Sequence, residues 1–206
     1  MKNCAAWLMS AIATLPATAH AATVLSVDLS IINQVTITAE AGFSAVSASG
    51  SGFIGIYLDQ FYGGAGSPLD YALVSGDLTN ANNPARNTPQ LYRDSPTDTG
   101  LNIWAFSSDN TVNFTAGSLA FTGSATWTLS ELSYGDMLAG STGGSVFFPA
   151  DSFESIGGAT SIGEWGVAAV APIPLPGSAL LFGSALLGFG IYGRRKKAAI
   201  CSVTTS

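Results

Sequence analysis

Histidine, cysteine and lysine are nearly missing from this chain of 206 residues. It has one histidine and two cysteines, and none of the three residue types occurs between residues 22 and 171. That segment therefore has no Ser-His-Asp or Cys-His nucleophile, no Ser-Lys dyad and no zinc site with His or Cys ligands. It also has no disulfide, so its hydrophobic core alone must hold the fold. Nor does it contain a phosphate-binding glycine loop of the Walker or dinucleotide type.

Positive charge is also scarce in this segment. Two arginines, Arg86 and Arg93, stand against all thirteen acidic residues of the chain, which gives residues 22–171 a net charge of −11. Such a domain would repel the phosphates of nucleic acids and of anionic lipids, so no nucleic-acid partner is expected. The charge instead favours solubility, cation binding or a neutral partner such as a polysaccharide.

The first 21 residues have the features of a secretory signal peptide. Lys2 provides a positive start, and residues 5–15 form an apolar run that is too short to span a membrane. Ala19 and Ala21 supply the small side chains that signal peptidase requires at positions −3 and −1. The mature protein is therefore predicted to begin at Ala22, outside the inner membrane.

A second targeting segment is predicted at residues 172–197. It begins with a proline-rich spacer that includes Pro174 and Pro176, continues with a long uncharged run and ends in four adjacent basic residues. The uncharged run predicts one transmembrane helix over about residues 175–193. The basic residues favour the cytoplasmic side of the membrane, which leaves residues 198–206 as a short cytoplasmic tail.

The order of these features resembles the PEP-CTERM sorting signal, with Pro174-Leu175-Pro176 in place of Pro-Glu-Pro and with Arg194 and Arg195 in the basic cluster. Segments of this kind are also labelled ice-binding protein C-terminal domains, a label that implies no ice chemistry. The resemblance implies a Gram-negative bacterium that makes exopolysaccharide. It also implies processing by an exosortase-type membrane protease and a mature form at the cell surface or outside the cell. An ordinary C-terminal membrane anchor is the alternative.

Residues 22–171 are predicted to form one exported all-β domain. Apolar residues alternate with polar ones over about ten short segments, for example residues 35–39 and 125–129, as they do in half-buried strands. Glycine, serine, asparagine and aspartate separate these segments as turns. The pattern predicts an antiparallel β-sandwich or jelly roll, with one helix over residues 130–138. Six aromatic residues are predicted to lie in its core: Phe53, Tyr57, Trp104, Phe106, Trp127 and Trp165.

The alternation stops between Leu78 and Gly100, and this stretch contains both arginines of the domain. Long irregular segments in compact domains are usually functional or mobile, so a ligand would be sought here first. The residues predicted to contact it are Tyr92, Arg93, Asp94 and Asp98. The alternative is a solvated insertion in which Arg93 contacts Asp94 or Asp98.

The sequence favours a non-enzymatic protein of the cell surface or extracellular matrix that is associated with exopolysaccharide or biofilm. The first alternative is a carbohydrate-binding module, which would show an exposed Tyr or Trp in a groove beside loop acids. A glycoside hydrolase that uses two carboxylates is less favoured, because no spacing selects a pair among the loop acids. No cofactor is predicted; Ca²⁺ suits the acidic loops, but no EF-hand sequence is present.

Overall fold

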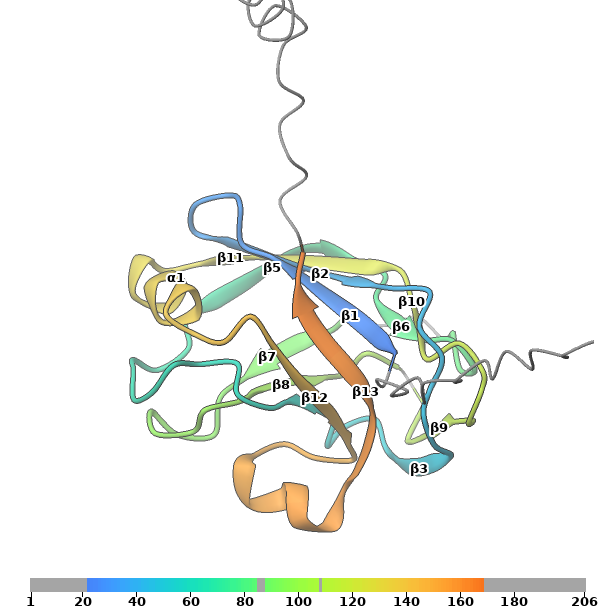
Figure 1. Cartoon of the computed structure of the whole chain (residues 1–206). Coiled ribbons are helices and arrows are strands. Elements are labelled where there is room, and N and C mark those ends of the chain that lie inside the picture. Colours follow the sequence, from blue (N-terminus) through green and yellow to red (C-terminus); the bar gives the residue numbers. More distant parts are fainter. Residues whose placement is uncertain (1–21, 85–87, 108, 169–206) are drawn as a thin grey trace, which may run out of the picture. The chain divides into compact units, whose positions relative to one another are not determined.

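The computed structural model describes residues 22–84, 88–107 and 109–168. The predicted signal peptide, Pro174 and Pro176, the transmembrane helix, and Arg194 and Arg195 lie outside the described residues, as does the tail. No helix in the described ranges is long and apolar enough to cross a membrane. The described part is one compact unit whose regular elements are almost all strands (Figure 1). The all-β prediction is therefore confirmed.

Nine strands form one large sheet, in the order β5-β11-β2-β1-β13-β12-β4-β8-β7. Their bounds in chain order are β1 Thr23–Asp28, β2 Gln34–Ala39, β4 Ile56–Leu58, β5 Tyr71–Gly76, β7 Gln90–Tyr92, β8 Leu101–Trp104, β11 Ser124–Leu129, β12 Gly143–Phe148 and β13 Thr160–Val167. Two small sheets pack beside it, formed by β3 (Ala48–Ser51) with β9 (Thr111–Phe114) and by β6 (Thr79–Asn80) with β10 (Phe121–Thr122).

The sheet is not purely antiparallel, which corrects one part of the prediction. β1 and β13, the first and last described strands, pair parallel in the middle of the sheet, with Val27 opposite Val167. Every other strand pair in the described residues is antiparallel. Alternation in a sequence shows which face of a strand is buried, but it does not show the direction of the neighbouring strand.

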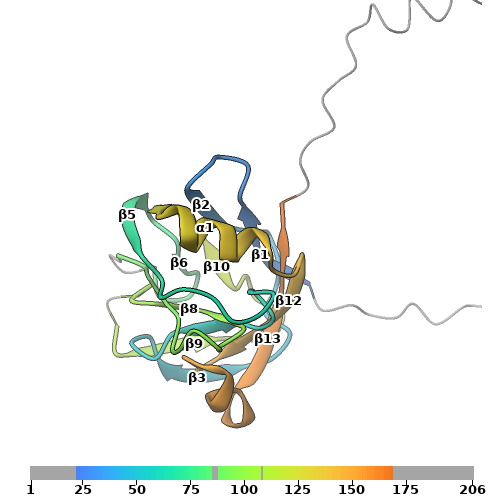
Figure 2. The ribbon, with the colours of Figure 1, turned by 90° about the vertical axis from the view of Figure 1, so that its left-hand side faces the viewer.

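The sheet curls until its two edge strands, β5 and β7, approach each other (Figures 1 and 2). The Tyr71 hydroxyl in β5 donates a hydrogen bond of 3.2 Å to the side-chain oxygen of Gln90 in β7. The indole N–H of Trp127 in β11 reaches the carbonyl of Pro89, just before β7, at 3.1 Å. The architecture is therefore closer to a nearly closed barrel than to the two stacked sheets of a sandwich.

The core fills the inside of this curl. Of the six aromatic residues predicted to be buried, Tyr57, Phe106, Trp127 and Trp165 are buried, and Trp104 is partly buried. Phe53 is 54% exposed, so that prediction was wrong. The reason is that the alternating pattern over residues 52–62, which is typical of one strand, contains only the short β4, and Phe53 lies in the turn before it.

The predicted helix is present as α1 (Glu131–Leu138), and its N-cap is Ser130. The Ser130 hydroxyl accepts a hydrogen bond from the backbone N–H of Ser133 at 3.2 Å, which satisfies one of the free donors at the start of the helix. Ser133, which with Asp136 three residues later also has the spacing of a capped start, lies inside the first turn. The other helical element among the described residues is η1 (Phe153–Gly158), a 3₁₀ helix before β13.

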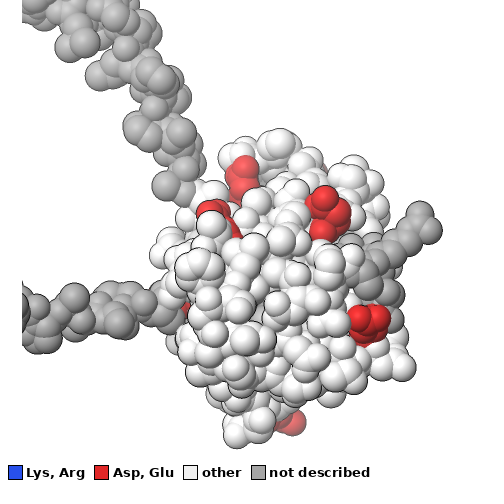
Figure 3. All heavy atoms as spheres, turned by 90° about the vertical axis from the view of Figure 1, so that its right-hand side faces the viewer, with Lys and Arg blue, Asp and Glu red and all other residues white. Residues whose placement is uncertain are grey.

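The surface of the domain is sparsely charged. Figure 3 shows one face on which a few acidic side chains are scattered and no basic side chain is seen. Arg93 is the one basic residue among the described residues, and only 8% of it is exposed. The exposed charge of the described domain is therefore acidic.

Candidate functional site

The segment predicted as an irregular loop is partly ordered into strands, because it contains β6 and β7. In β7, Leu91 is buried and Tyr92 is exposed, and Arg93 just after the strand is again buried. This alternation continues through Asp94, which is exposed. The four predicted ligand residues therefore divide into two kinds: Tyr92 and Asp94 face solvent, whereas Arg93 and Asp98 point inward.

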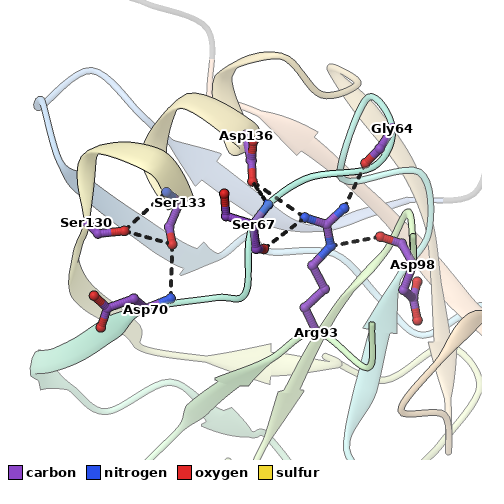
Figure 4. A network of polar contacts seen from close by, with 8 residues as sticks. All are labelled: Gly64, Ser67, Asp70, Arg93, Asp98, Ser130, Ser133 and Asp136. Atoms are coloured by element: carbon purple, nitrogen blue, oxygen red, sulfur yellow. Dashed lines mark hydrogen bonds and ion pairs between the residues drawn. The ribbon is translucent and has the colours of Figure 1, made fainter. Parts of the chain in front are cut away.

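Arg93 connects three segments of the chain (Figure 4). Its guanidinium donates hydrogen bonds to the carbonyls of Gly64 at 2.7 Å and of Asp98 at 2.9 Å, and a longer one of 3.5 Å to Ser67. It also lies 3.7 Å from a carboxylate oxygen of Asp136 in α1. The contact between Arg93 and Asp98 runs through the Asp98 backbone, while the ion pair is with Asp136. Arg93 thus joins the Gly64–Ser67 segment and the loop after β7 to α1.

The ring of Tyr62 completes the surroundings of Arg93. The guanidinium carbon lies 3.9 Å from the ring centroid, within the range of a cation–π contact. The Tyr62 hydroxyl is buried and finds no hydrogen-bond partner among the described residues. Burial raises the pKa of this hydroxyl, which keeps it protonated. Protein atoms therefore cover the cation of Arg93, as is typical of a structural arginine.

The same network attaches the segment before β5 to the helix. The Ser67 N–H donates to the Asp136 carboxylate at 2.6 Å, and the Asp70 N–H donates to the Ser133 hydroxyl at 2.9 Å. The Ser133 hydroxyl is in turn 3.1 Å from that of Ser130 (Figure 4). These contacts hold the Ser67–Asp70 segment in place, and this segment forms one wall of the groove described below.

Asp98 anchors its own loop through side-chain hydrogen bonds. One carboxylate oxygen accepts from the hydroxyl of Tyr57 and, at 2.9 Å, from the N–H of Gly100. The other accepts from the N–H of Phe153 in η1 at 3.2 Å. Burial is the main cause that raises the pKa of Tyr57 well above its ordinary value, and the hydrogen bond to Asp98 is the second cause. Asp98, only 6% exposed, therefore orders the loop from within.

The buried tyrosines predict a loss of stability in alkaline solution. A tyrosine in the unfolded chain has a pKa near ~10, whereas the folded protein raises the pKa of Tyr57 and of Tyr62. Their contribution to the free energy of unfolding is complete below pH ~10. It is lost progressively above that pH, because the unfolded chain then releases protons that the folded protein keeps. We expect the free energy of unfolding to fall by about 1.4 kcal/mol per pH unit for each tyrosine above that pH. Urea denaturation at pH 8 and pH 11 measures this loss. A midpoint that is the same at both pH values contradicts the prediction.

An aromatic groove of about 340 Å³ opens where the two edges of the sheet approach. Tyr92 lies in it with 43% of its surface exposed, and its hydroxyl donates a hydrogen bond of 3.1 Å to Asp94. That hydrogen bond is the main cause that raises the pKa of Tyr92. The partly buried Tyr71 and Trp104 add two more rings. The groove is lined by Pro68, Leu69, Tyr71, Leu91, Tyr92, Arg93, Asp94, Ser95, Pro96 and Trp104.

A second, acidic pocket of about 300 Å³ shares Asp94 and Ser95 with the aromatic groove. Its other acidic residues are Asp98 and Glu154. Both carboxylate oxygens of Asp98 accept hydrogen bonds from the protein itself, which leaves Asp94 and Glu154 as its exposed acids. Among the described residues, no group of three or more His, Cys, Asp or Glu side chains is placed to hold a metal ion.

No protein-family model matches this chain, and neither the curated proteins nor the solved structures contain a match. The sequence indicated Tyr92 and Asp94, which line the aromatic groove, but it did not indicate Tyr71, Trp104 or Glu154 as site residues. Those three come from β5, β8 and η1, and no local pattern connects them before the sheet curls.

Proposed function

We propose that this chain is a non-enzymatic protein of the cell surface or extracellular matrix whose described domain binds a neutral polysaccharide. The observation that carries the proposal is the groove between β5 and β7, where Tyr71, Tyr92 and Trp104 converge beside Asp94. An exposed aromatic residue in a groove beside loop acids is the feature expected of a carbohydrate-binding module and not of its alternatives. The groove therefore supports carbohydrate binding as the specific role proposed for the domain.

The chemistry of the groove suits a sugar chain. The faces of aromatic rings present flat apolar surfaces, and the C–H faces of a pyranose ring are also apolar, so the two pack together. The hydroxyl of Tyr92 and the carboxylate of Asp94 supply polar atoms for the sugar hydroxyls. The acidic surface opposes anionic polymers, which favours a neutral glycan. A neutral exopolysaccharide of a biofilm is a ligand of this class.

Export, anchoring and sorting belong to the same proposal and are supported by the sequence segments. In this proposal signal peptidase cuts before Ala22, and the apolar run at about 175–193 holds the precursor in the inner membrane. An exosortase-type protease then processes the segment, and the mature protein is placed at the cell surface or released. The polysaccharide groove would act in the exported domain after this step.

The groove can be tested by measuring how the mature protein binds neutral soluble glucans and mannans in affinity electrophoresis and calorimetry. Replacing Tyr92 with alanine is expected to weaken binding about 10-fold, since stacking on one exposed ring is worth roughly 1.4 kcal/mol. Tyr92→Phe keeps the ring and should retain most of the affinity. Phe53→Ala is the matched control, because Phe53 is an exposed aromatic residue outside the groove.

Two results would contradict the proposal. If the Tyr92→Ala variant binds the polysaccharide as tightly as the unaltered protein does, the groove is not the binding site. If the protein releases new reducing ends from the polysaccharide, and Asp94→Asn or Glu154→Gln abolishes this release, the protein is a two-carboxylate glycoside hydrolase and not a non-enzymatic binding protein.

A further inference from the structure

The turn between β1 and β2 carries two apolar side chains that no part of the described domain covers. Ile31 is 57% exposed and Ile32 is 76% exposed, and they are adjacent in the chain. The turn itself is well held: the Gln34 N–H donates to the Ile31 carbonyl at 3.1 Å, and the Leu129 N–H donates to the Asn33 carbonyl at 2.8 Å. A rigid turn thus presents two large β-branched residues to the outside of the domain.

This turn lies at the end of the domain where the described chain finishes. Val27 in β1 is opposite Val167 in β13, and the Ala168 N–H donates to the Val27 carbonyl at 2.8 Å. The parallel pairing of β1 and β13 therefore brings the turn and the last described residue together. Figures 1 and 2 both show the β1–β2 turn and the end of β13 at the same end of the domain, with η1 at the other.

The sequence places a predicted membrane span shortly after this point. Leu175, where the apolar run begins, is the seventh residue after Ala168, and seven residue steps reach at most about 25 Å. An anchored protein therefore keeps this end of the domain close to the lipid surface. Residues 29–33 contain no charged side chain, and Asp28 at the start of the turn is acidic. An uncharged or zwitterionic surface suits this turn better than an anionic one.

We propose that the β1–β2 turn docks into the interfacial layer of the membrane that anchors the chain, with Ile31 and Ile32 inserted among the lipid headgroups and upper acyl chains. Apolar side chains that insert into a lipid interface are stabilised because their apolar surface is removed from water. Docking would fix the orientation of the domain and hold its η1 end away from the bilayer. This inference rests on the anchoring proposed above, and it adds a lipid-binding surface to it.

The test uses the mature chain, residues 22–206, with Cys201→Ser and one new cysteine labelled with an environment-sensitive fluorophore. Ser30→Cys places the label in the turn. Gly157→Cys in η1 is the control, because Gly157 lies at the opposite end of the domain and a side chain there meets nothing within 4 Å. Both proteins are reconstituted into phosphatidylcholine vesicles with and without nitroxide-bearing lipids.

We expect a blue-shifted emission and strong nitroxide quenching at position 30, and neither at position 157. Adding Ile31→Ser and Ile32→Ser to the Ser30→Cys protein should abolish the shift. A protein that floats with vesicles but shows no quenching at position 30 overturns the docking while the anchoring stands. A protein that does not float overturns both. A shift at position 30 that depends on protein concentration and not on lipid assigns the surface to a second copy, which also overturns the proposal.

Discussion

Replacing Arg93 with methionine is expected to lower the free energy of unfolding by about 3 kcal/mol. Methionine keeps much of the length of the side chain but removes the charge and every donor. The Asp136 carboxylate then loses its cation, and the carbonyls of Gly64 and Asp98 lose their hydrogen bonds in a site where the Arg93 side chain is only 2% exposed. Buried acceptors without partners are costly, because water no longer compensates them.

Urea denaturation followed by tryptophan fluorescence measures this change. Arg93→Lys keeps the charge but not the planar fork that reaches two carbonyls at once, so we expect it to recover only part of the loss. Asp136→Asn keeps an oxygen for the Ser67 N–H and should cost less than Arg93→Met. Combining Arg93→Met with Asp136→Asn gives their coupling in a double-mutant cycle.

The same variant distinguishes a structural arginine from a ligand-binding one. If Arg93→Met is as stable as the unaltered protein but binds polysaccharide poorly, the guanidinium acts on the ligand and its structural assignment fails. If stability falls and binding falls with it, the loss follows from the groove wall, because Arg93 holds both the Gly64–Ser67 segment and the loop after β7.

The strands of this domain could be predicted because burial alternates along them. Val35 and Ile37 in β2, and Ala125 and Trp127 in β11, are buried at a spacing of two residues, as the sequence indicates. The partners of the strands could not be predicted in this way. The parallel contact between β1 and β13 joins segments far apart in the chain, and alternation carries no information about such neighbours.

The candidate groove was predictable in part for the same reason. The break in alternation drew attention to Tyr92 and Asp94, which do lie at the groove, and to Arg93 and Asp98, which the fold turns inward. The sequence of an irregular segment does not show whether a charged residue is buried and structural or exposed and able to contact a ligand. Trp104 was expected in the core because aromatic residues usually lie there, and the curl of the sheet leaves it at the edge of a groove.

The sorting proposal predicts the second large effect. In a host that has an exosortase, replacing Pro174 and Pro176 with alanine is expected to leave the full-length protein in the membrane. The unaltered protein should instead lose residues 194–206. Three prolines in residues 172–176 predict a stiff, extended backbone before the apolar run, and alanine would remove this restriction. The resemblance assigns recognition to the Pro-x-Pro pair, so processing should stop almost completely.

Mass spectrometry of the protein recovered from membranes and from the medium measures the outcome. Pro172→Ala is the matched control, since it removes a proline of the same spacer but leaves Pro174-Leu175-Pro176 intact, and it should be processed normally. A host without an exosortase should keep residues 194–206 on every version. If the unaltered protein keeps these residues in the competent host as well, the segment is a plain anchor, because four adjacent positive charges and an apolar run suffice to hold a chain in the membrane without any protease.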